Sequence, residues 1–380
     1  MIYLDNSATT RPTDAVRAAV DTAMREGFFN PSALYAPAMA AEKEMRLCRE
    51  EILKQLHFPS GKVVFTGCGT EADNLMISGT LASLREGRVL YTAGEHPAVK
   101  EPCVHAGSGI TAQEIPFDRD GRVDIEKLEG MLDEDVKLIC VMQVNNETGA
   151  IQPVNEIAAL RDRLCPKALL HVDGVQGFLR VPFDMSKCRA DSYALSGHKI
   201  HAVKGIGALV YGPRCRISPR MLGGGQESGM RSGTENTPGI AALKEAVTTF
   251  PFDQIDAMRQ CKIHLYRRIK ELIPAAAVNG PDPESDLAAP HVLNISIEPV
   301  RSETMLHALE GEGIYVGIGS ACSSHKQKVS ATLRAMGIAP KQAESALRFS
   351  LCPYNTVEEM DTVAEALKRH YDVLSRFSRR

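Results

Sequence analysis

The residues of this chain best suited to chemistry are a lysine, an aspartate and a cysteine, each in a distinctive setting. Lys199 closes a Ser-Gly-His-Lys turn, Asp173 ends an apolar, strand-like run, and Cys322 follows Gly-Ser-Ala in a loop of small residues. A lysine amine can form a Schiff base with an aldehyde cofactor, an acid can keep a pyridinium nitrogen protonated, and a thiolate can act as nucleophile. Together the three residues predict pyridoxal phosphate (PLP) chemistry coupled to a thiol. Any one of them alone indicates little.

Asp173 and Lys199 lie one strand–helix–strand step apart, so neighbouring strand ends would present both side chains to one ligand. A carboxylate at the end of a buried strand is unfavourable unless it is paired with a cation. A pyridinium N–H would serve as that cation, and a neighbouring arginine or lysine is the structural alternative. For Lys199 the alternative is an ordinary solvated surface charge.

A glycine-containing turn at residues 66–71 stands between a predicted strand and the start of a predicted helix. Backbone N–H groups at such a helix start, together with the Thr70 hydroxyl, suit a phosphate group. The spacing is not that of a P-loop, because no Lys-Ser/Thr pair follows the glycines. Many strand-to-helix turns contain glycine for steric reasons alone, so the turn by itself is a weak indication.

His96 and Asn146 also follow predicted strands. Taken alone, His96 is best interpreted as an ordinary helix-start residue, and residues 145–149 as a turn that Asn and Gly favour. In a PLP enzyme, a histidine at the end of a sheet strand would stack on the pyridine ring and move protons.

These residues need a sheet to position them, and the hydrophobic pattern predicts one. Between about residue 60 and residue 212, short apolar runs alternate with amphipathic stretches, which predicts an α/β fold with a mostly parallel sheet and helices on both faces. Strands are expected at 63–66, 89–92, 138–142, 168–172, 192–195 and 207–211, and helices at 38–57, 71–85, 97–106 and 155–164.

A smaller α+β domain is predicted beyond Pro251, which follows a helical segment ending near Phe250. Its helices are expected at 254–272, 302–312 and 356–374, and its strands at 291–297, 314–318 and 346–351. We expect residues 15–250 to form the large cofactor-binding domain. Residues 1–14 and 251–380 would form the small domain, which carries the Cys322 loop.

Composition excludes several classes of protein. The 380 residues carry a formal net charge of −3 with no polybasic block, which argues against nucleic acid as the main ligand. No apolar run is long enough to span a bilayer and the first residues do not resemble a signal peptide, so we expect a cytoplasmic protein. The ten cysteines show neither a Cys-x-x-Cys pair nor metal-like spacing, so no metal site is predicted. Most of these cysteines are interpreted as small, reduced, buried hydrophobic residues.

Motifs along nearly the whole chain resemble the cysteine desulfurases of the NifS/IscS type, within the class-V aminotransferase family. They occur in family order, and their joint occurrence is highly specific. The motifs occupy residues 4–10, 30–32, 70–74, 95–96, 144–149, 171–173, 196–199, 204–209, 223–227, 231–236, 319–322 and 347–350.

The resemblance implies PLP fold type I, a homodimer, and conversion of L-cysteine to L-alanine with the sulfur left on the enzyme as a persulfide. Sulfur-acceptor proteins of iron–sulfur cluster assembly or tRNA thiolation would then receive that sulfur. The resemblance places the Schiff base on Lys199, the pyridinium partner on Asp173, the ring-stacking acid/base on His96 and the persulfide on Cys322.

The same resemblance implies the remaining contacts of cofactor and substrate. Asn146 and Arg348 would hold the substrate carboxylate, a task that a bidentate guanidinium suits, and Asn146 would also contact the cofactor. Gln176 would contact the cofactor's phenolic oxygen. The phosphate would be held by Gly69, Thr70, Ser196 and His198, with Thr234 arriving from the partner subunit.

The chain departs from the family pattern at three places. Cys68 stands in the phosphate turn where glycine is usual, Tyr35 replaces a usual histidine, and residues 201–203 read His-Ala-Val in place of Tyr-Gly-Pro. Two interpretations of Cys68 remain open. It is either a neutral replacement, or a second active-site thiol that attacks the substrate sulfur or relays sulfur with Cys322, aided by the helix N-terminus.

Two other functions are compatible with these motifs. One is a different fold type I PLP enzyme, such as a selenocysteine lyase or an aminotransferase. The other is a weakly active scaffold that binds sulfur-acceptor proteins. The Cys322 loop favours a desulfurase over an aminotransferase, which has no use for such a thiol, and intact Lys199, Asp173 and His96 argue against a scaffold.

Overall fold

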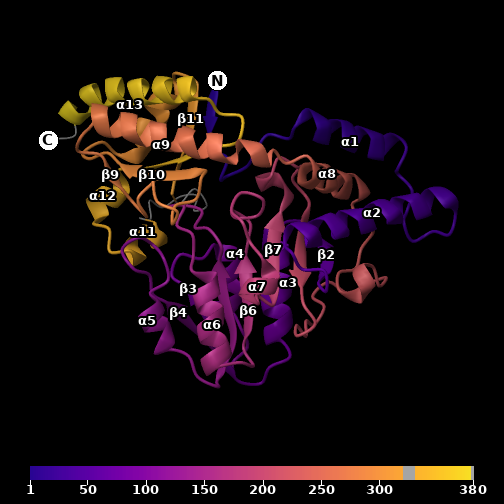
Figure 1. The fold of residues 1–380 in the computed structure, drawn as a ribbon. Helices are drawn as coiled ribbons and strands as arrows, with labels where there is room; N and C mark the ends of the chain where they lie inside the picture. Colours follow the sequence, from indigo (N-terminus) through magenta and orange to yellow (C-terminus); the bar gives the residue numbers. More distant parts are fainter. Residues whose placement is uncertain (320–329, 378–380) are drawn as a thin grey trace.

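The computed structural model describes residues 1–319 and 330–377, which form two β-sheets with helices packed around them (Figure 1). The larger sheet has seven strands in the order β2-β8-β7-β6-β5-β3-β4. Strands β7, β6, β5, β3 and β4 run parallel, and β8 is antiparallel to both β7 and β2. The strands are β2 (Lys62–Thr66), β3 (Gly87–Thr92), β4 (Ile110–Ile115), β5 (Val136–Met142), β6 (Leu169–Asp173), β7 (Ser192–Ser196) and β8 (Gly207–Tyr211).

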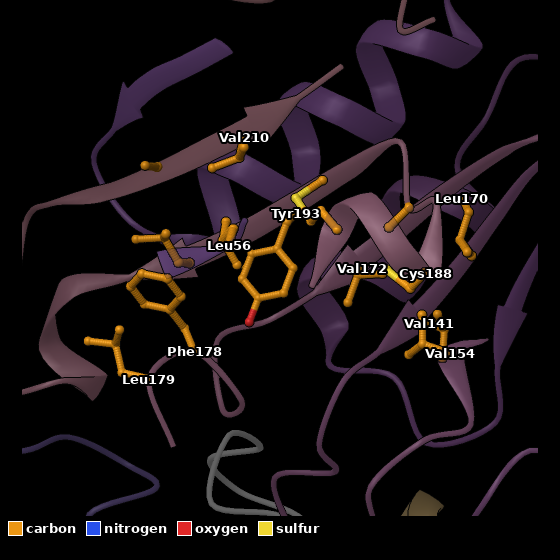
Figure 2. Packing of buried hydrophobic residues seen from close by; sticks show 14 of the residues in the cluster. Leu56, Val141, Val154, Leu170, Val172, Phe178, Leu179, Cys188, Tyr193 and Val210 are labelled. Carbon is orange, nitrogen blue, oxygen red and sulfur yellow. The ribbon is translucent and has the colours of Figure 1, made fainter. Parts of the chain in front are cut away.

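Both faces of this sheet are buried, as expected for a parallel sheet. Along β5, Ile139 and Val141 pack in one hydrophobic cluster, whereas Leu138 and Cys140 pack in another on the opposite face. Figure 2 shows part of the first cluster, where the Tyr193 ring of β7 lies among aliphatic side chains and Phe178.

Helices cover each face. On the first face lie α2 (Ala36–Gln55), α6 (Val154–Leu164) and α8 (Thr237–Thr248), and on the opposite face lie α3 (Gly69–Leu81) and α4 (Pro97–Val104). Three shorter or peripheral helices complete this part of the chain: α1 (Asp14–Arg25), α5 (Ile125–Glu129) and α7 (Met185–Cys188).

The second sheet has five strands in the order β1-β11-β12-β10-β9 and lies beside the first in Figure 1. Its hydrophobic cluster includes residues of the long helices α9 and α13. The strands are β1 (Ile2–Leu4), β9 (Ala277–Val278), β10 (Val292–Ser296), β11 (Ile314–Ile318) and β12 (Ala346–Ser350), and the helices are α9 (Ile255–Leu272), α10 (Ser302–Glu310), α11 (Ala331–Ala335), α12 (Pro340–Glu344) and α13 (Val357–Phe377).

The α/β fold with a mostly parallel sheet, helices on both faces and a smaller α+β part is confirmed. Each predicted strand and helix is present, with ends that differ by a few residues. Three strands were not predicted: β1 and β9 are only three and two residues long, and β4 is an edge strand rich in polar residues. In the part of the chain that the structure describes, no helix is both long and apolar enough to cross a membrane.

Candidate active site

A cavity of about 280 Å³ lies where β5, β6 and β7 end and α3 begins. Parallel strands bring their carboxyl ends to one edge of a sheet, which is where α/β proteins bind ligands. The cavity is lined by the predicted residues Cys68, Gly69, Thr70, His96, Asn146, Asp173, Gln176, Ser196, His198, Lys199 and Arg348.

Two predicted site residues are not among the residues described at the cavity wall. Thr234 is exposed and does not line the cavity, and its predicted role in a partner subunit stays a prediction. Cys322 lies outside the described residues. Gly319, the last residue described before it, does line the cavity.

Lys199 ends a short 3₁₀ turn that directly follows β7. Its Nζ donates hydrogen bonds to the backbone oxygens of Ser7 (2.5 Å) and Ala8 (2.9 Å). Burial, helped by the positive charges of Arg348 and Arg180, lowers the pKa of Lys199 to about 8. The amine is therefore much more readily deprotonated than a surface lysine and is suited to act as a nucleophile.

Asp173 is the last residue of β6 and is only 6% exposed. Its Oδ1 accepts a hydrogen bond from the Val175 N–H at 2.9 Å. Burial raises the pKa of Asp173, against the opposing effects of that hydrogen bond, His96 and Lys199. Among the described residues no arginine or lysine forms an ion pair with this carboxyl group, so the alternative of a protein cation as its partner is not supported.

His96 caps the N-terminus of α4 with its ring, because Nδ1 accepts a hydrogen bond from the Ala98 N–H at 3.1 Å. Nδ1 is thus the acceptor in the neutral ring, and the proton sits on Nε2. Burial lowers the pKa of His96, although the nearby Asp173 opposes this effect. The imidazole is therefore held in one orientation and one tautomer at the wall of the cavity.

The start of α3 has the features of an anion cup. The N-cap residue, Cys68, makes no side-chain capping bond, so it leaves backbone N–H groups of the first turn without a side-chain partner. The Ser196 hydroxyl is buried without a hydrogen-bond partner in the described structure. A side chain at Gly69 would place its Cβ only 2.7 Å from Val175 Cγ2, so a glycine is needed for this close approach.

Arg348 enters the cavity from β12 in the second sheet. Its neighbours Leu347 and Phe349 point into the hydrophobic cluster of that sheet, so Arg348 points the other way, toward the cavity. Nη1 donates to the Asn146 backbone oxygen at 3.0 Å, and Nη2 to Asp5 Oδ1 at 2.7 Å. Nε has no partner, so the guanidinium is fixed and still has N–H capacity for an anionic ligand.

Several residues around the site were not predicted. Ser7 and Asp5 belong to the N-terminal segment: the Ser7 backbone oxygen also accepts from Gln176 Nε2 at 3.0 Å, and Asp5 holds Arg348. Asp73 lines the cavity from α3. All three lie in motif stretches that carry the family resemblance, but no chemical pattern in the sequence distinguished them.

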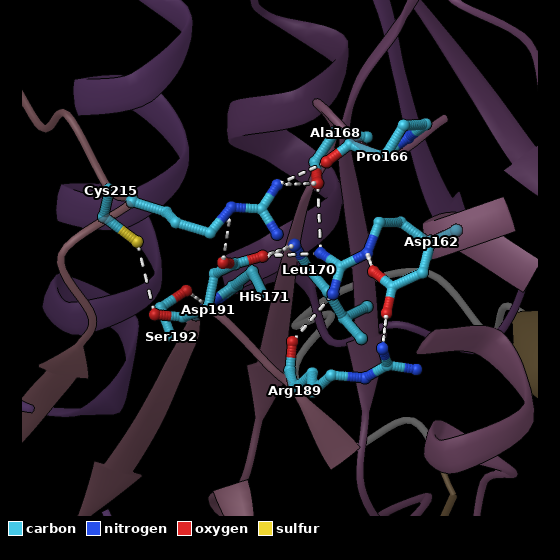
Figure 3. A network of polar contacts seen from close by, with 11 residues as sticks. Asp162, Pro166, Ala168, Leu170, His171, Arg189, Asp191, Ser192 and Cys215 are labelled. Atoms are coloured by element: carbon cyan, nitrogen blue, oxygen red, sulfur yellow. Dashed lines mark hydrogen bonds and ion pairs between the residues drawn. The ribbon is translucent and has the colours of Figure 1, made fainter. Parts of the chain in front are cut away.

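A separate polar network holds the opposite, amino-terminal ends of β6 and β7 (Figure 3). The fully buried Arg161 donates to Asp191 Oδ2 and Asp162 Oδ1, both at 2.6 Å, and to the backbone oxygens of Ala168 and Arg189. Asp191 also accepts from the Leu170 N–H at 2.8 Å. The two strands that carry the site at their carboxyl ends are therefore anchored at their amino-terminal ends.

Comparisons with known proteins agree with this geometry. Residues 2–363 match the model of the family described as aminotransferase class-V. A cysteine desulfurase from Nostoc sp. is 35% identical over 374 residues, covering 97% of this chain and 92% of that protein. The cysteine desulfurase NifS of Azotobacter vinelandii is 36% identical over 368 residues, covering 95% and 90%. A solved structure described as a NifS-like protein is 32% identical, with a TM-score of 0.89, covering 98% of this chain and all of that one.

The fold and the comparisons define a PLP-dependent enzyme of fold type I, since a sheet of this order presents a buried lysine and an acid to one cavity. Within that class, the chain belongs to the class-V aminotransferase family and is a cysteine desulfurase of the NifS/IscS type. The relatives do not favour the alternatives of an aminotransferase, a selenocysteine lyase or a scaffold.

Proposed function

We propose that this chain binds PLP in the 280 Å³ cavity and there converts L-cysteine to L-alanine, with the sulfur passed to an enzyme thiol. The observation that carries this proposal is that Lys199 and Asp173 face one cavity while neither forms an ion pair within the described residues. Each would find a partner in PLP, whose aldehyde reacts with an amine and whose pyridine nitrogen pairs with an acid.

The residues present fit the cofactor. The unpartnered Ser196 hydroxyl, Thr70 and the first N–H groups of α3 would hold the phosphate, with His198 beside them. Asp173 would pair with the ring nitrogen and His96 would cover the ring. The Gln176 amide would reach the phenolic oxygen, and PLP, when bound, supplies an electron sink for bonds at the substrate α-carbon.

The substrate would be oriented by Arg348 and Asn146, which approach from opposite sheets. Lys199 Nζ would hold or release a proton at the substrate α-carbon. Its pKa, lowered to about 8, allows both the ammonium form and the free amine to be present near neutral pH. His96 Nε2–H would donate a proton on the substrate side, since Nδ1 is already occupied by Ala98.

We propose Cys322 as the sulfur acceptor, on the resemblance and on the position of Gly319 in the cavity wall. The thiolate forms an S–S bond to the substrate sulfur as the substrate Cβ–S bond breaks, and the carbon then takes a proton to leave alanine. Cys68 also lines the cavity and remains either a neutral replacement or a second thiol.

We further propose a homodimer in which Thr234 completes the partner's cavity. The exposed large apolar side chains include Phe28, Leu34 and Met39 in one stretch of the chain and Leu222 in another. The bridge between Met221 and Arg231 places Leu222 close to the segment that carries Thr234. Sulfur-acceptor proteins of iron–sulfur assembly or tRNA thiolation remain the proposed partners, and the cytoplasm the expected compartment.

The test is to add L-cysteine to the PLP-loaded protein and to measure alanine and sulfide with and without a thiol reductant. We expect alanine in both cases, and multiple turnovers only with reductant, because the persulfide must be discharged. Absence of alanine, or appearance of a keto acid in its place, would overturn the proposal.

A further inference from the structure

A buried chain of three polar side chains runs from the cavity wall into the sheet. His171 Nε2 lies 3.1 Å from Asp73 Oδ1, and His171 Nδ1 lies 2.9 Å from Ser192 Oγ. None of the three side chains is more than 1% exposed. Figure 3 shows the His171 and Ser192 end of this chain, where the two residues are paired across β6 and β7.

Asp73 and Asp173 approach the same end of the cavity. Asp73 comes from α3, and Asp173 is two residues after His171 on β6, so His171 and Asp173 point to the same face of the sheet, toward α3. Both aspartates line the cavity. PLP placed as proposed would bring one cation, the pyridinium N–H, to two carboxyl groups.

Among the described residues, Asp73 is in hydrogen-bond contact with His171, and no arginine or lysine forms an ion pair with it. Its hydrogen-bond partner His171 is held neutral, since burial lowers its pKa to about 3. The pKa of Asp73 is raised well above its usual range by burial, then by the negative charges of Asp173 and Glu95. The titratable groups that face this region are Asp173 and His171 on β6, Glu95 and His96 before α4, Cys103 on α4, Cys140 on β5, Cys68 before α3 and Lys199 after β7.

We propose that Asp73 keeps its proton and donates it to His171 Nε2, so that Asp173 is the one charged carboxyl group that faces the pyridine nitrogen. In this arrangement His171 Nδ1–H donates in turn to Ser192 Oγ, and the whole chain is neutral. Asp73 and His171 are then positioning residues: they fill the space beside Asp173 without placing a second negative charge there. Two ionised carboxylates lining one buried cavity would repel each other and would not both stay charged.

The opposite assignment moves the proton from Asp73 to His171 Nε2 and is compatible with the same two distances, from His171 to Asp73 and to Ser192. Asp73 would be ionised and would accept from His171 Nε2–H, while Ser192 O–H would donate to Nδ1. The two assignments therefore predict different tautomers of His171, and a measurement of the tautomer distinguishes them.

The first experiment is ¹⁵N NMR of the histidine-labelled holoenzyme at neutral pH, with the His171 signal assigned by its change in Ser192→Ala. We expect Nδ1 protonated and Nε2 unprotonated. The Nε2–H tautomer would overturn the proposal.

The second experiment measures the pH midpoint of the visible absorption change of bound PLP in three proteins. In Asp73→Asn the amide N–H replaces the acid O–H at the same place and with the same charge, so the midpoint should stay within about 0.3 pH unit of the parent protein. Asp173→Asn removes a real charge and serves as the positive control, with an expected fall of at least one unit. A fall in Asp73→Asn comparable to that in Asp173→Asn would show that Asp73 is ionised.

This inference rests on the proposed function, because it assumes that the pyridine nitrogen faces Asp173. Failure of this inference and failure of the proposed function would give different results. If Asp173→Asn leaves the absorption unchanged, the cofactor assignment is wrong, whereas the His171 tautomer is read independently of PLP and can be measured in the cofactor-free protein as well.

Discussion

Burial perturbs Lys199 and Asp173 in opposite directions, and this is the central fact at the scale of single residues. It lowers the pKa of the amine and raises the pKa of the acid. In the absence of a ligand, burial therefore favours the uncharged form of both groups. A ligand with an aldehyde and a protonated ring nitrogen would relieve both, which ties the electrostatics to the proposed cofactor.

Lys199→Ala removes the group proposed to attach the cofactor. We expect a loss of cysteine turnover of about a thousandfold or more, because neither attachment nor proton transfer at this position remains. Borohydride treatment of the parent protein should fix PLP to the peptide that contains Lys199, and peptide mass spectrometry checks this. Reduced cofactor on a different lysine would refute the assignment.

The lowered pKa of Lys199 makes a prediction about pH. Only the neutral amine attacks an aldehyde, so uptake of PLP by the cofactor-free protein should accelerate as pH rises through about 8 and level off above it. Below that pH the ammonium form dominates and uptake slows. Stopped-flow absorbance between pH 6 and pH 10 provides the measurement, and a rate still rising at the upper limit would contradict the lowered pKa.

The two candidate thiols are separated by single substitutions. Cys322→Ala should lose nearly all alanine production, whereas Cys68→Ala should keep it within about threefold, because a thiol in a rigid helix start cannot carry sulfur to a distant acceptor. Mass spectrometry after cysteine treatment should find added sulfur on the Cys322 peptide. If Cys68→Ala binds PLP but makes no alanine, the enzyme uses two cysteines.

At the scale of elements, the segment that follows β1 is as much part of the site as the strand ends are. Thr10 Oγ1 donates to the His198 backbone oxygen at 2.9 Å and accepts from the His201 N–H at 2.7 Å, so it holds both sides of the Lys199 turn. Ser7 and Ala8 meet Lys199 itself.

Thr10→Val keeps the shape of the side chain and removes both hydrogen bonds of its hydroxyl. We expect a loss of about 1–3 kcal/mol in the free energy of unfolding and a weaker affinity for PLP by about tenfold. Thr13→Ala is the matched control: the Thr13 hydroxyl caps α1, and Thr13 meets the turn only through its backbone N–H, which the substitution keeps, so loss of the side chain should cost about 1 kcal/mol without changing PLP affinity. Urea unfolding and PLP titration measure the two effects, and equal PLP affinity in both variants would remove the role given to Thr10.

Elements with a strong hydrophobic pattern could be predicted from the sequence, and elements that depend on pairing could not. β5 and β6 are buried on both faces and read as continuous apolar runs. β4 alternates with polar residues such as Gln113 and Glu114, which an edge strand tolerates, and the three residues of β1 carry too little pattern to be detected.

The residues of the site likewise include some that could be predicted from the sequence and some that could not. Residues at strand ends, such as Asp173 and Lys199, could be predicted because parallel strands bring their ends together. Asp73 could not, since its importance comes from a contact with His171, which lies 98 residues away. Asp5 likewise acquires its role only when Arg348 arrives from the far end of the chain.

On the scale of the whole molecule, we propose that residues 15–250 form one domain and residues 1–14 with 251–380 the other. The membership of β1 in the second sheet supports the assignment of the first residues to the small domain. The chain is less cleanly divided near α11 and α12, where Leu333, Met336 and Ala343 pack into the hydrophobic cluster of the large sheet.

The exposed apolar surface provides a test of the proposed homodimer. Leu222 is 83% exposed and lies near the Thr234 segment, so Leu222→Asp should shift the protein from dimer toward monomer and weaken PLP binding. Phe377 is 76% exposed at the end of α13, on the other part of the molecule, so Phe377→Asp should leave the dimer intact. Sedimentation velocity checks both, and a Leu222→Asp protein that remains fully dimeric would refute the proposed interface.

The pairing of β1 with β11 has a consequence for synthesis of the protein on the ribosome. Residues 2–4 emerge first, yet they pair with residues 314–316, and the Asn6 N–H donates to the Ser350 backbone oxygen. The carbonyl groups that hold Lys199 therefore cannot take their positions until almost the whole chain has been translated, although the large sheet is complete much earlier. A nascent chain stalled before residue 314 should fold its large sheet and still fail to capture the cofactor, so that loading is delayed until translation is nearly finished.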